Sequence, residues 1–165
     1  MENQTKRLRL LLVDDEKQFV EVMTQRLTKR NYSVVPAFSG EEALERLEED
    51  SPIEVVVLDV KMPGRDGIAT LKAIKKRHPL VEVILLTGHS TVKSAVAGIK
   101  LGAFDYLMKP CDIDLLLSKL EGAAARKRHH ENQIRQVQTK PYISRREKDA
   151  LISEILEAAT SKGPA

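Results

Sequence analysis

The chain has 165 residues, of which 42% are hydrophobic and 31% are charged, an ordinary composition for a globular protein. No apolar stretch approaches the roughly 18 residues of a membrane-spanning helix, and the first residues lack the apolar segment of a secretory signal. The single cysteine, Cys111, excludes an internal disulfide, so we expect a cytoplasmic protein with no membrane partner.

The net charge of +3 is unevenly distributed along the chain. Residues 1–121 carry 18 Lys and Arg against 19 Asp and Glu, whereas residues 122–165 carry nine against five. The basic character therefore belongs to the C-terminal part. The balanced charge of the body gives no electrostatic reason to expect direct binding of nucleic acid.

Five short apolar runs alternate with helical patterns between residue 8 and about residue 120. Such runs, rich in Val, Ile and Leu, are typical of the buried strands of a parallel sheet. They are residues 10–13 (LLLV), 32–37 (YSVVPA), 55–58 (VVVL), 81–86 (VEVILL) and 104–108 (FDYLM).

Apolar residues at helical spacing follow each of the first four runs, and Asp112 is a plausible N-cap for a fifth helix. The second helix opens with a capping box that joins Ser39 to Glu42. Five strand–helix units predict right-handed crossovers with helices on both faces of the sheet. We expect an α/β, flavodoxin-like doubly wound fold with strand order 2-1-3-4-5. The apolar helix positions are Phe19, Val22, Met23 and Leu27; Ala43, Leu44 and Leu47; Ile68, Leu71 and Ile74; and Val92, Ala95, Val96 and Ile99.

The fifth helix continues beyond the end of a minimal domain. It would run from Asp112 to Gln138, or about 40 Å, and Pro141 would end it. A second capping box begins at Ser144 and opens a short helix with an apolar face. We therefore divide the chain into a domain at residues 1–121 and a basic helical extension at residues 122–165. This extension would either pair with another copy or a target, or fold back on its own domain.

Polar side chains follow four of the five runs. Asp14 and Asp15 follow the first, Asp59 the third, Thr87 the fourth and Lys109 the fifth. Because parallel strands present their carboxyl ends at one edge, these groups would meet where open α/β sheets bind ligands. Clustered carboxylates repel one another unless a cation is present, and oxygen-only ligands suit Mg²⁺. Taken alone, the Asp pair would also suit a helix N-terminus.

A lysine beside carboxylates can hold a phosphoryl oxygen as a point charge. Lys109 precedes Pro110, which admits a cis peptide bond that would aim the lysine inward.

With these residues in this order, the sequence resembles the receiver domains of response regulators. The resemblance covers roughly residues 7–121, in the family's order and spacing. Its motifs are residues 12–16 (LVDDE), 58–64 (LDVKMPG), 86–88 (LTG) and 102–110 (GAFDYLMKP).

The resemblance implies a phosphoryl-transfer site with Mg²⁺ as cofactor. Asp59 would accept a phosphoryl group from a sensor histidine kinase or a histidine phosphotransfer protein. Asp14, Asp15 and Asp59 would bind the metal, together with the backbone carbonyl of Lys61, and Lys109 would contact the phosphoryl oxygens. This agrees with the physics, since metal and lysine neutralise charge on the transferred group.

The resemblance also implies a conformational switch and residues that set the lifetime of the acyl phosphate. Thr87 would move to hydrogen-bond the phosphoryl group, and Tyr106, expected to be buried, would swing inward behind it. The surface under their control would be the fourth helix, fifth strand and fifth helix. Lys61 and His89 would tune the hydrolysis of the acyl phosphate.

We therefore expect a phosphorylation-dependent response regulator whose output is contact with a downstream protein or self-dimerisation. It would not be an enzyme beyond self-catalysed phosphoryl acceptance and slow autodephosphorylation. Two alternatives stay open: the receiver part of a longer DNA-binding or ATPase regulator, and a phosphotransfer intermediate. A hydrolase of the haloacid-dehalogenase type is disfavoured, because it needs a second acid where Lys61 stands.

Overall fold

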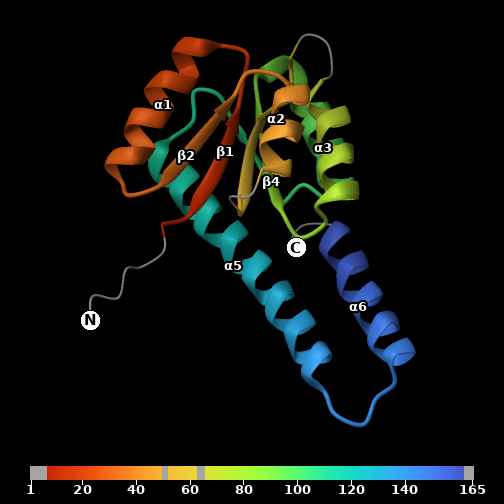
Figure 1. Cartoon of the computed structure of the whole chain (residues 1–165). Helices are drawn as coiled ribbons and strands as arrows, with labels where there is room; N and C mark the ends of the chain where they lie inside the picture. The colour runs from red at the N-terminus through yellow and green to blue at the C-terminus, as the bar shows by residue number, and fades with distance from the viewer. Residues whose placement is uncertain (1–6, 50–51, 63–65, 162–165) are drawn as a thin grey trace, which may run out of the picture.

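The computed structural model describes residues 7–49, 52–62 and 66–161, and its core is a five-stranded sheet (Figure 1). The strand order is β2-β1-β3-β4-β5 and every pairing is parallel. The predicted flavodoxin-like fold and its strand order are therefore confirmed. The strands are β1 (Arg9–Val13), β2 (Ser33–Ala37), β3 (Val55–Asp59), β4 (Glu82–Thr87) and β5 (Asp105–Met108).

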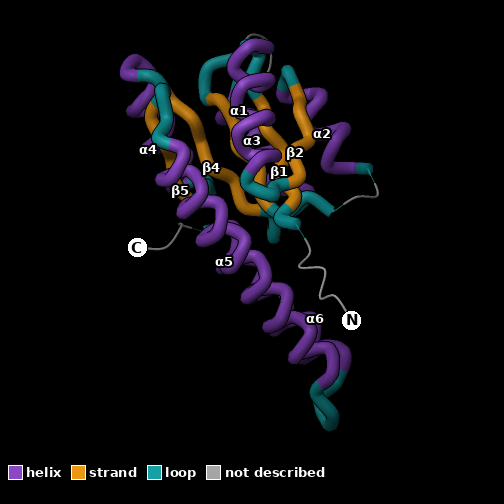
Figure 2. Tube along the Cα trace, turned by 90° about the vertical axis from the view of Figure 1, so that its left-hand side faces the viewer, coloured by secondary structure: helices purple, strands orange, loops and turns teal. Residues whose placement is uncertain are grey.

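Helices cover both faces of the sheet (Figures 1 and 2). Side chains that alternate along β1 enter two different cores: Leu11 and Val13 pack toward α2, α3 and α4, whereas Leu10 and Leu12 pack toward α1 and α5. Burial on both faces explains why these strands are continuously apolar. The helices are α1 (Lys17–Lys29), α2 (Gly40–Glu48), α3 (Gly67–Arg77), α4 (Val92–Lys100), α5 (Ile113–Thr139) and α6 (Arg145–Thr160), and a 3₁₀ turn, η1 (His89–Thr91), precedes α4.

Two of the apolar residues that mark the helices lie in solvent rather than in the core. Val22 on α1 is 53% exposed and Val96 on α4 is 46% exposed. In each case the neighbouring residue is the buried one, Met23 and Ala95 respectively. One residue along a helix turns the side chain by about 100°, which is enough to carry it from the sheet to solvent.

The C-terminal extension forms a helical hairpin. The helix α5 has 27 residues, or about 40 Å, and its first half packs on the sheet while the rest extends beyond it (Figure 2). The helix α6 lies antiparallel to α5 (Figure 1). It begins with the predicted capping box, in which Ser144 Oγ accepts from Glu147 N at 3.1 Å and Glu147 Oε2 accepts from Ser144 N at 2.8 Å. In the part of the chain that is described, no helix combines the length and hydropathy that crossing a membrane requires.

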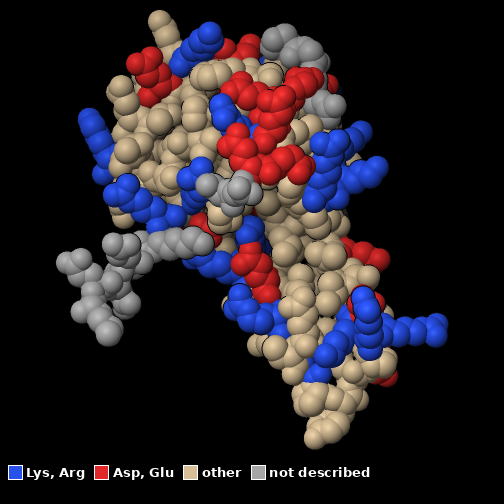
Figure 3. All heavy atoms as spheres, in the orientation of Figure 1, with Lys and Arg blue, Asp and Glu red and all other residues tan. Residues whose placement is uncertain are grey.

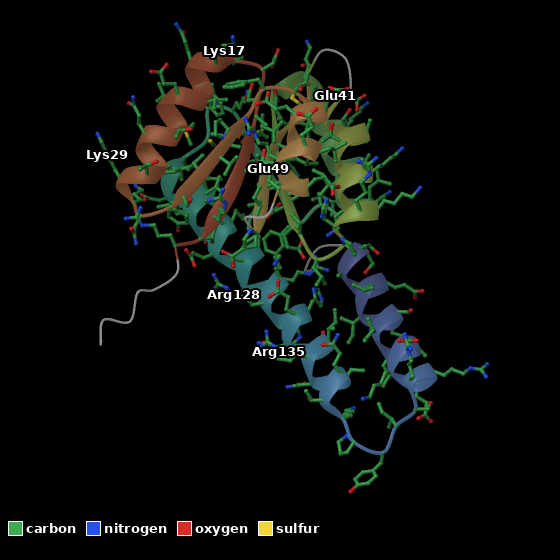
Figure 4. All side chains as sticks on the ribbon, viewed as in Figure 1. Lys17, Lys29, Glu41, Glu49, Arg128 and Arg135 are labelled. Carbon is green, nitrogen blue, oxygen red and sulfur yellow. The ribbon has the colours of Figure 1, made fainter. Side chains whose placement is uncertain are left out.

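Charge on the surface is grouped by element. Acidic side chains gather over α2 in Figure 3, and Figure 4 labels Glu41 and Glu49 near its two ends. Basic side chains gather over the last turn of α3. Acidic and basic groups thus occupy separate patches on this face of the body.

Candidate functional site

Three carboxylates meet where β1 and β3 end. Val13 and Leu58 are register partners on these adjacent strands, so the residues that follow them, Asp14 and Asp59, lie side by side. Asp14 is fully buried, Asp59 is buried with 8% of its side chain exposed, and Asp15 is exposed. One oxygen from each of the three carboxylates lies within 4.8 Å of the others. This donor set, made of oxygen atoms only, fits a hard divalent cation such as Mg²⁺.

Backbone contacts fix the direction of these acids. Asp14 Oδ1 accepts a hydrogen bond from Glu16 N at 3.0 Å, and Asp59 Oδ1 accepts one from Lys61 N at 3.4 Å.

Gly67 at the start of α3 is a structural requirement that the sequence pattern did not indicate. A Cβ atom at this position would lie 2.3 Å from the backbone oxygen of Asp59, so only glycine permits this approach.

Lys109 reaches the same cluster from the end of β5. Its Nζ lies 2.5 Å from Asp14 Oδ2, 3.6 Å from Glu16 Oε1 and 3.7 Å from Asp59 Oδ2. The peptide bond between Lys109 and Pro110 is cis, as the sequence allowed. Nζ also lies 4.4 Å from the centroid of the Phe19 ring, a cation–π contact. The sequence indicates Phe19 only as an apolar position of the first helix, since no pattern links it to Lys109.

Burial and mutual repulsion raise the proton affinity of the carboxylates. Burial, followed by the charge of Asp14, raises the pKa of Asp59 to about 6 even though Lys109 opposes the shift. Burial also raises the pKa of Asp14 above its usual value. Burial alone would lower the pKa of Lys109, but its hydrogen bond to Asp14 and the acids around it raise that pKa overall. A bound divalent cation would relieve the repulsion between the acids.

Thr87 lies at the end of β4 with its hydroxyl engaged in its own loop. The residue is fully buried. Its Oγ1 donates to the Gly88 carbonyl at 3.0 Å and shares a 2.5 Å hydrogen bond with Thr91 Oγ1. Thr91 was not singled out from the sequence, because a threonine four residues on in a polar loop carries no pattern. The Thr87 hydroxyl therefore has a defined partner that it can exchange for another.

The other residues predicted to act in the switch or in hydrolysis lie on β5, after β3 and in η1. Tyr106 on β5 is half-buried, less than expected, and packs against the core beneath α4. Lys61 is exposed, with its backbone N–H directed to Asp59. The backbone of His89 begins the turn η1, but its side chain lies outside what the structure describes, as do residues 63–65 of the predicted loop.

The model of the response regulator receiver domain family matches residues 10–121. The chain belongs to this family. The DNA-binding transcriptional regulator NtrC of Klebsiella pneumoniae is 40% identical over 122 residues, which are 74% of this chain and 25% of that protein. A receiver domain structure from Clostridium thermocellum is 36% identical with a TM-score of 0.70, and the match covers 73% of this chain and 96% of that one.

The similarity to one longer structure extends into the C-terminal hairpin. The structure of NtrX from Brucella abortus is 28% identical with a TM-score of 0.72, and the match covers 90% of this receiver chain but only 34% of NtrX. This chain spans about a quarter of the length of its curated relative NtrC. The comparisons therefore establish that this chain contains a receiver domain. The activities of the longer regulators are known here only as properties of those relatives.

Proposed function

We propose that this receiver accepts a phosphoryl group on Asp59 from a phosphohistidine of a sensor kinase or a histidine phosphotransfer protein in the cytoplasm. A carboxylate oxygen of Asp59 forms the new bond to phosphorus. The phosphorus–nitrogen bond breaks, and its electron pair stays on the imidazole. The observation that carries the proposal is the position of Asp59, in a cluster of three acids with Lys109 Nζ 3.7 Å away.

The residues around Asp59 have separate roles in this proposal. Mg²⁺ would be held by Asp14, Asp15, Asp59 and the Lys61 carbonyl. The bound ion would neutralise negative charge on the transferred phosphoryl group. Lys109 provides a fixed positive charge for the phosphoryl oxygens, held in place by Asp14. Such preorganised charge contributes most of the catalysis in phosphoryl transfer.

The switch uses Thr87 and Tyr106. On phosphorylation the Thr87 hydroxyl gives up Thr91 and donates instead to a phosphoryl oxygen, which shifts the loop before α4. Tyr106, packed beneath α4, follows into the vacated space. The two states differ in contacts with the phosphoryl group, so phosphorylation can bias them. Lys61 and His89, two residues past Asp59 and Thr87, would set the lifetime of the acyl phosphate.

The output follows one of two routes. In the first, the surface of α4, β5 and α5 binds a downstream protein or a second copy of this chain. In the second, the chain is the receiver part of a longer regulator, a reading favoured by its match to a quarter of a DNA-binding regulator. Reversible return of the phosphoryl group to a histidine phosphotransfer protein would instead indicate a phosphotransfer intermediate.

The deciding experiment is phosphorylation with a small acyl phosphate and Mg²⁺, read by intact mass. We expect a mass gain of one phosphoryl group that requires Mg²⁺ and is lost in Asp59→Asn. Asp66→Asn is a matched control, because Asp66 is an exposed acid that caps α3, and asparagine caps equally well. Light scattering on the same samples reports self-association. If the wild type shows no mass gain, the proposed chemistry is wrong.

A further inference from the structure

The C-terminal end of α6 returns to the receiver body at the end of the sheet opposite the three carboxylates (Figure 1). Contact occurs at Gly102, two residues after α4, where a Cβ atom would lie only 2.7 Å from the carbonyl oxygen of Thr160. Ala159 beside it is fully buried. The last turn of α6 therefore lies directly against the junction of α4 and β5.

Arg126 on α5 joins this turn to the sheet. Its Nη2 donates to the Ala158 carbonyl at 3.1 Å, and its Nη1 lies 3.5 Å from Glu82 Oε2. Glu82 begins β4 and is fully buried. The last carbonyls of a helix need partners, and a cation there is favourable. The last turn of α6 contains no basic residue of its own. Arg126, on α5, therefore provides the positive charge at this helix end.

Further buried polar groups surround this contact. Lys75 on α3 is 5% exposed, and its Nζ donates to the carbonyls of Pro79 at 2.9 Å and Val81 at 3.0 Å. The Lys75 Cε atom lies 3.3 Å from the Cβ position at Gly102. His130 on α5 is 7% exposed. Burying several ionisable groups at one place is costly unless they are paired. Lys75, Glu82 and Arg126 each have a partner here, so they form a built site rather than a solvated surface.

Part of the boundary between hairpin and body is an open groove. This solvent-open groove of about 340 Å³ lies beside the cluster, lined by Leu156 of α6 and Lys127 of α5 on one side and by residues 47, 49, 52, 53 and 78–81 of the body on the other. The end of α6 is therefore attached through the hydrogen bond from Arg126 and through the buried side chain of Ala159.

We propose that Lys75, Glu82, Gly102 and Arg126 form a docking surface for the C-terminal turn of a helix, and that α6 occupies it as a latch. The release mechanism rests on the proposed phosphorylation of Asp59. The strand β4 runs from Glu82 at the docking surface to Thr87 at the opposite end, and α4 leads from the Thr87 loop to Gly102. Movement of α4 on phosphorylation displaces Gly102 from Thr160, releases α6 and frees its apolar face, which comprises Ile152, Ile155 and Leu156.

Hydrogen exchange of the α6 amides, measured by mass spectrometry on the unphosphorylated full chain, tests the docking surface. We expect Arg126→Ala to speed their exchange about tenfold, as loss of a hydrogen bond from a charged donor implies. Arg128→Ala is the matched control. This substitution removes the same charge, but Arg128 pairs with Glu54 and lies on the side of α5 away from α6 (Figure 4). Arg128→Ala should therefore leave the exchange of the α6 amides unchanged.

Arg126→Ala also leaves Glu82 buried without this partner, which can destabilise the whole domain. Ala159→Glu avoids this problem, because it places a charge at the buried contact from the α6 side and leaves Arg126 and Glu82 together. Slow exchange of the β3 amides reports that the domain is folded. If α6 exchange is unchanged in both variants, the docking surface does not exist.

Phosphorylated wild-type protein tests the release. With phosphorylation verified by intact mass, α6 exchange should rise in the wild type and stay slow in Asp59→Asn. A mass gain with unchanged α6 exchange would overturn the release mechanism and leave the proposed phosphorylation standing. Absence of any mass gain would overturn the proposed function, and the Arg126 and Ala159 variants would then decide the docking surface alone.

Discussion

Replacement of Asp59 by asparagine should stabilise the metal-free protein at neutral pH. The pKa of Asp59 rises from 3.8 to about 6 on folding, chiefly through burial and then through the charge of Asp14. A shift of about two units corresponds to roughly 3 kcal/mol by which the ionised carboxylate destabilises the folded state. Asparagine removes this charge and keeps an acceptor oxygen for the Lys61 N–H. We expect the free energy of unfolding to rise by roughly 1–3 kcal/mol at pH 7.

The sign of the pH dependence follows from the raised pKa. Above pH 6 Asp59 is ionised in both states, so the folded state carries the full penalty. As the pH falls through 6, the folded state takes up a proton that the unfolded state binds only near 3.8. The advantage of Asp59→Asn over the wild type should therefore shrink to about half between pH 7 and pH 5.

Urea denaturation followed by circular dichroism, in EDTA and at several values between pH 5 and pH 8, measures this difference. Asp66→Asn controls for the loss of an exposed acid, and its stability should differ from that of the wild type by no more than about 0.5 kcal/mol at every pH. An Asp59→Asn variant no more stable than the wild type at pH 7 would refute the reasoning. A gain independent of pH would show that its source is not the Asp59 charge.

Three further predictions concern the metal, the close approach at α3 and the tail. Mg²⁺ at about 100 times its dissociation constant should stabilise the wild type by about 2.7 kcal/mol and Asp59→Asn by clearly less, as measured by urea denaturation; equal stabilisation would place the ion elsewhere. Gly67→Ala should lower the free energy of unfolding by about 3 kcal/mol or more, because its Cβ would overlap the Asp59 carbonyl; near-wild-type stability would contradict that contact. Ser144→Ala should speed exchange in the first turn of α6 through the loss of about 1 kcal/mol of capping energy, whereas Ser153→Ala, exposed within the same helix, should not.

Much of the fold could be predicted from the sequence because its signals are local. Buried parallel strands are apolar along their whole length, so β1, β3 and β4 stand out without any knowledge of their neighbours. Capping residues such as Ser144 mark where a helix begins through bonds to the next few residues. Where the local signal is ambiguous, as between Val22 and Met23, the choice of the buried residue depends on where the sheet lies.

The convergence of Asp14, Asp59 and Lys109 was also foreseeable, because the strand order of the fold fixes which strand ends are neighbours. The contacts of Lys109 with Phe19 and of Thr87 with Thr91 were not foreseeable. Each depends on side-chain directions set by several elements at once, and no spacing along the chain encodes them.

By itself, the sequence determined that this protein is a doubly wound α/β domain with acids, a hydroxyl and a lysine at the carboxyl ends of its strands, and a helical tail. These features follow from residue type and spacing, which act over a few neighbours. Only the tertiary structure decided the course of the tail, which returns so that Arg126 contacts both Glu82 and the end of α6. A cation that caps a helix from another helix, while paired with a buried acid on a strand, depends on packing between segments more than 30 residues apart.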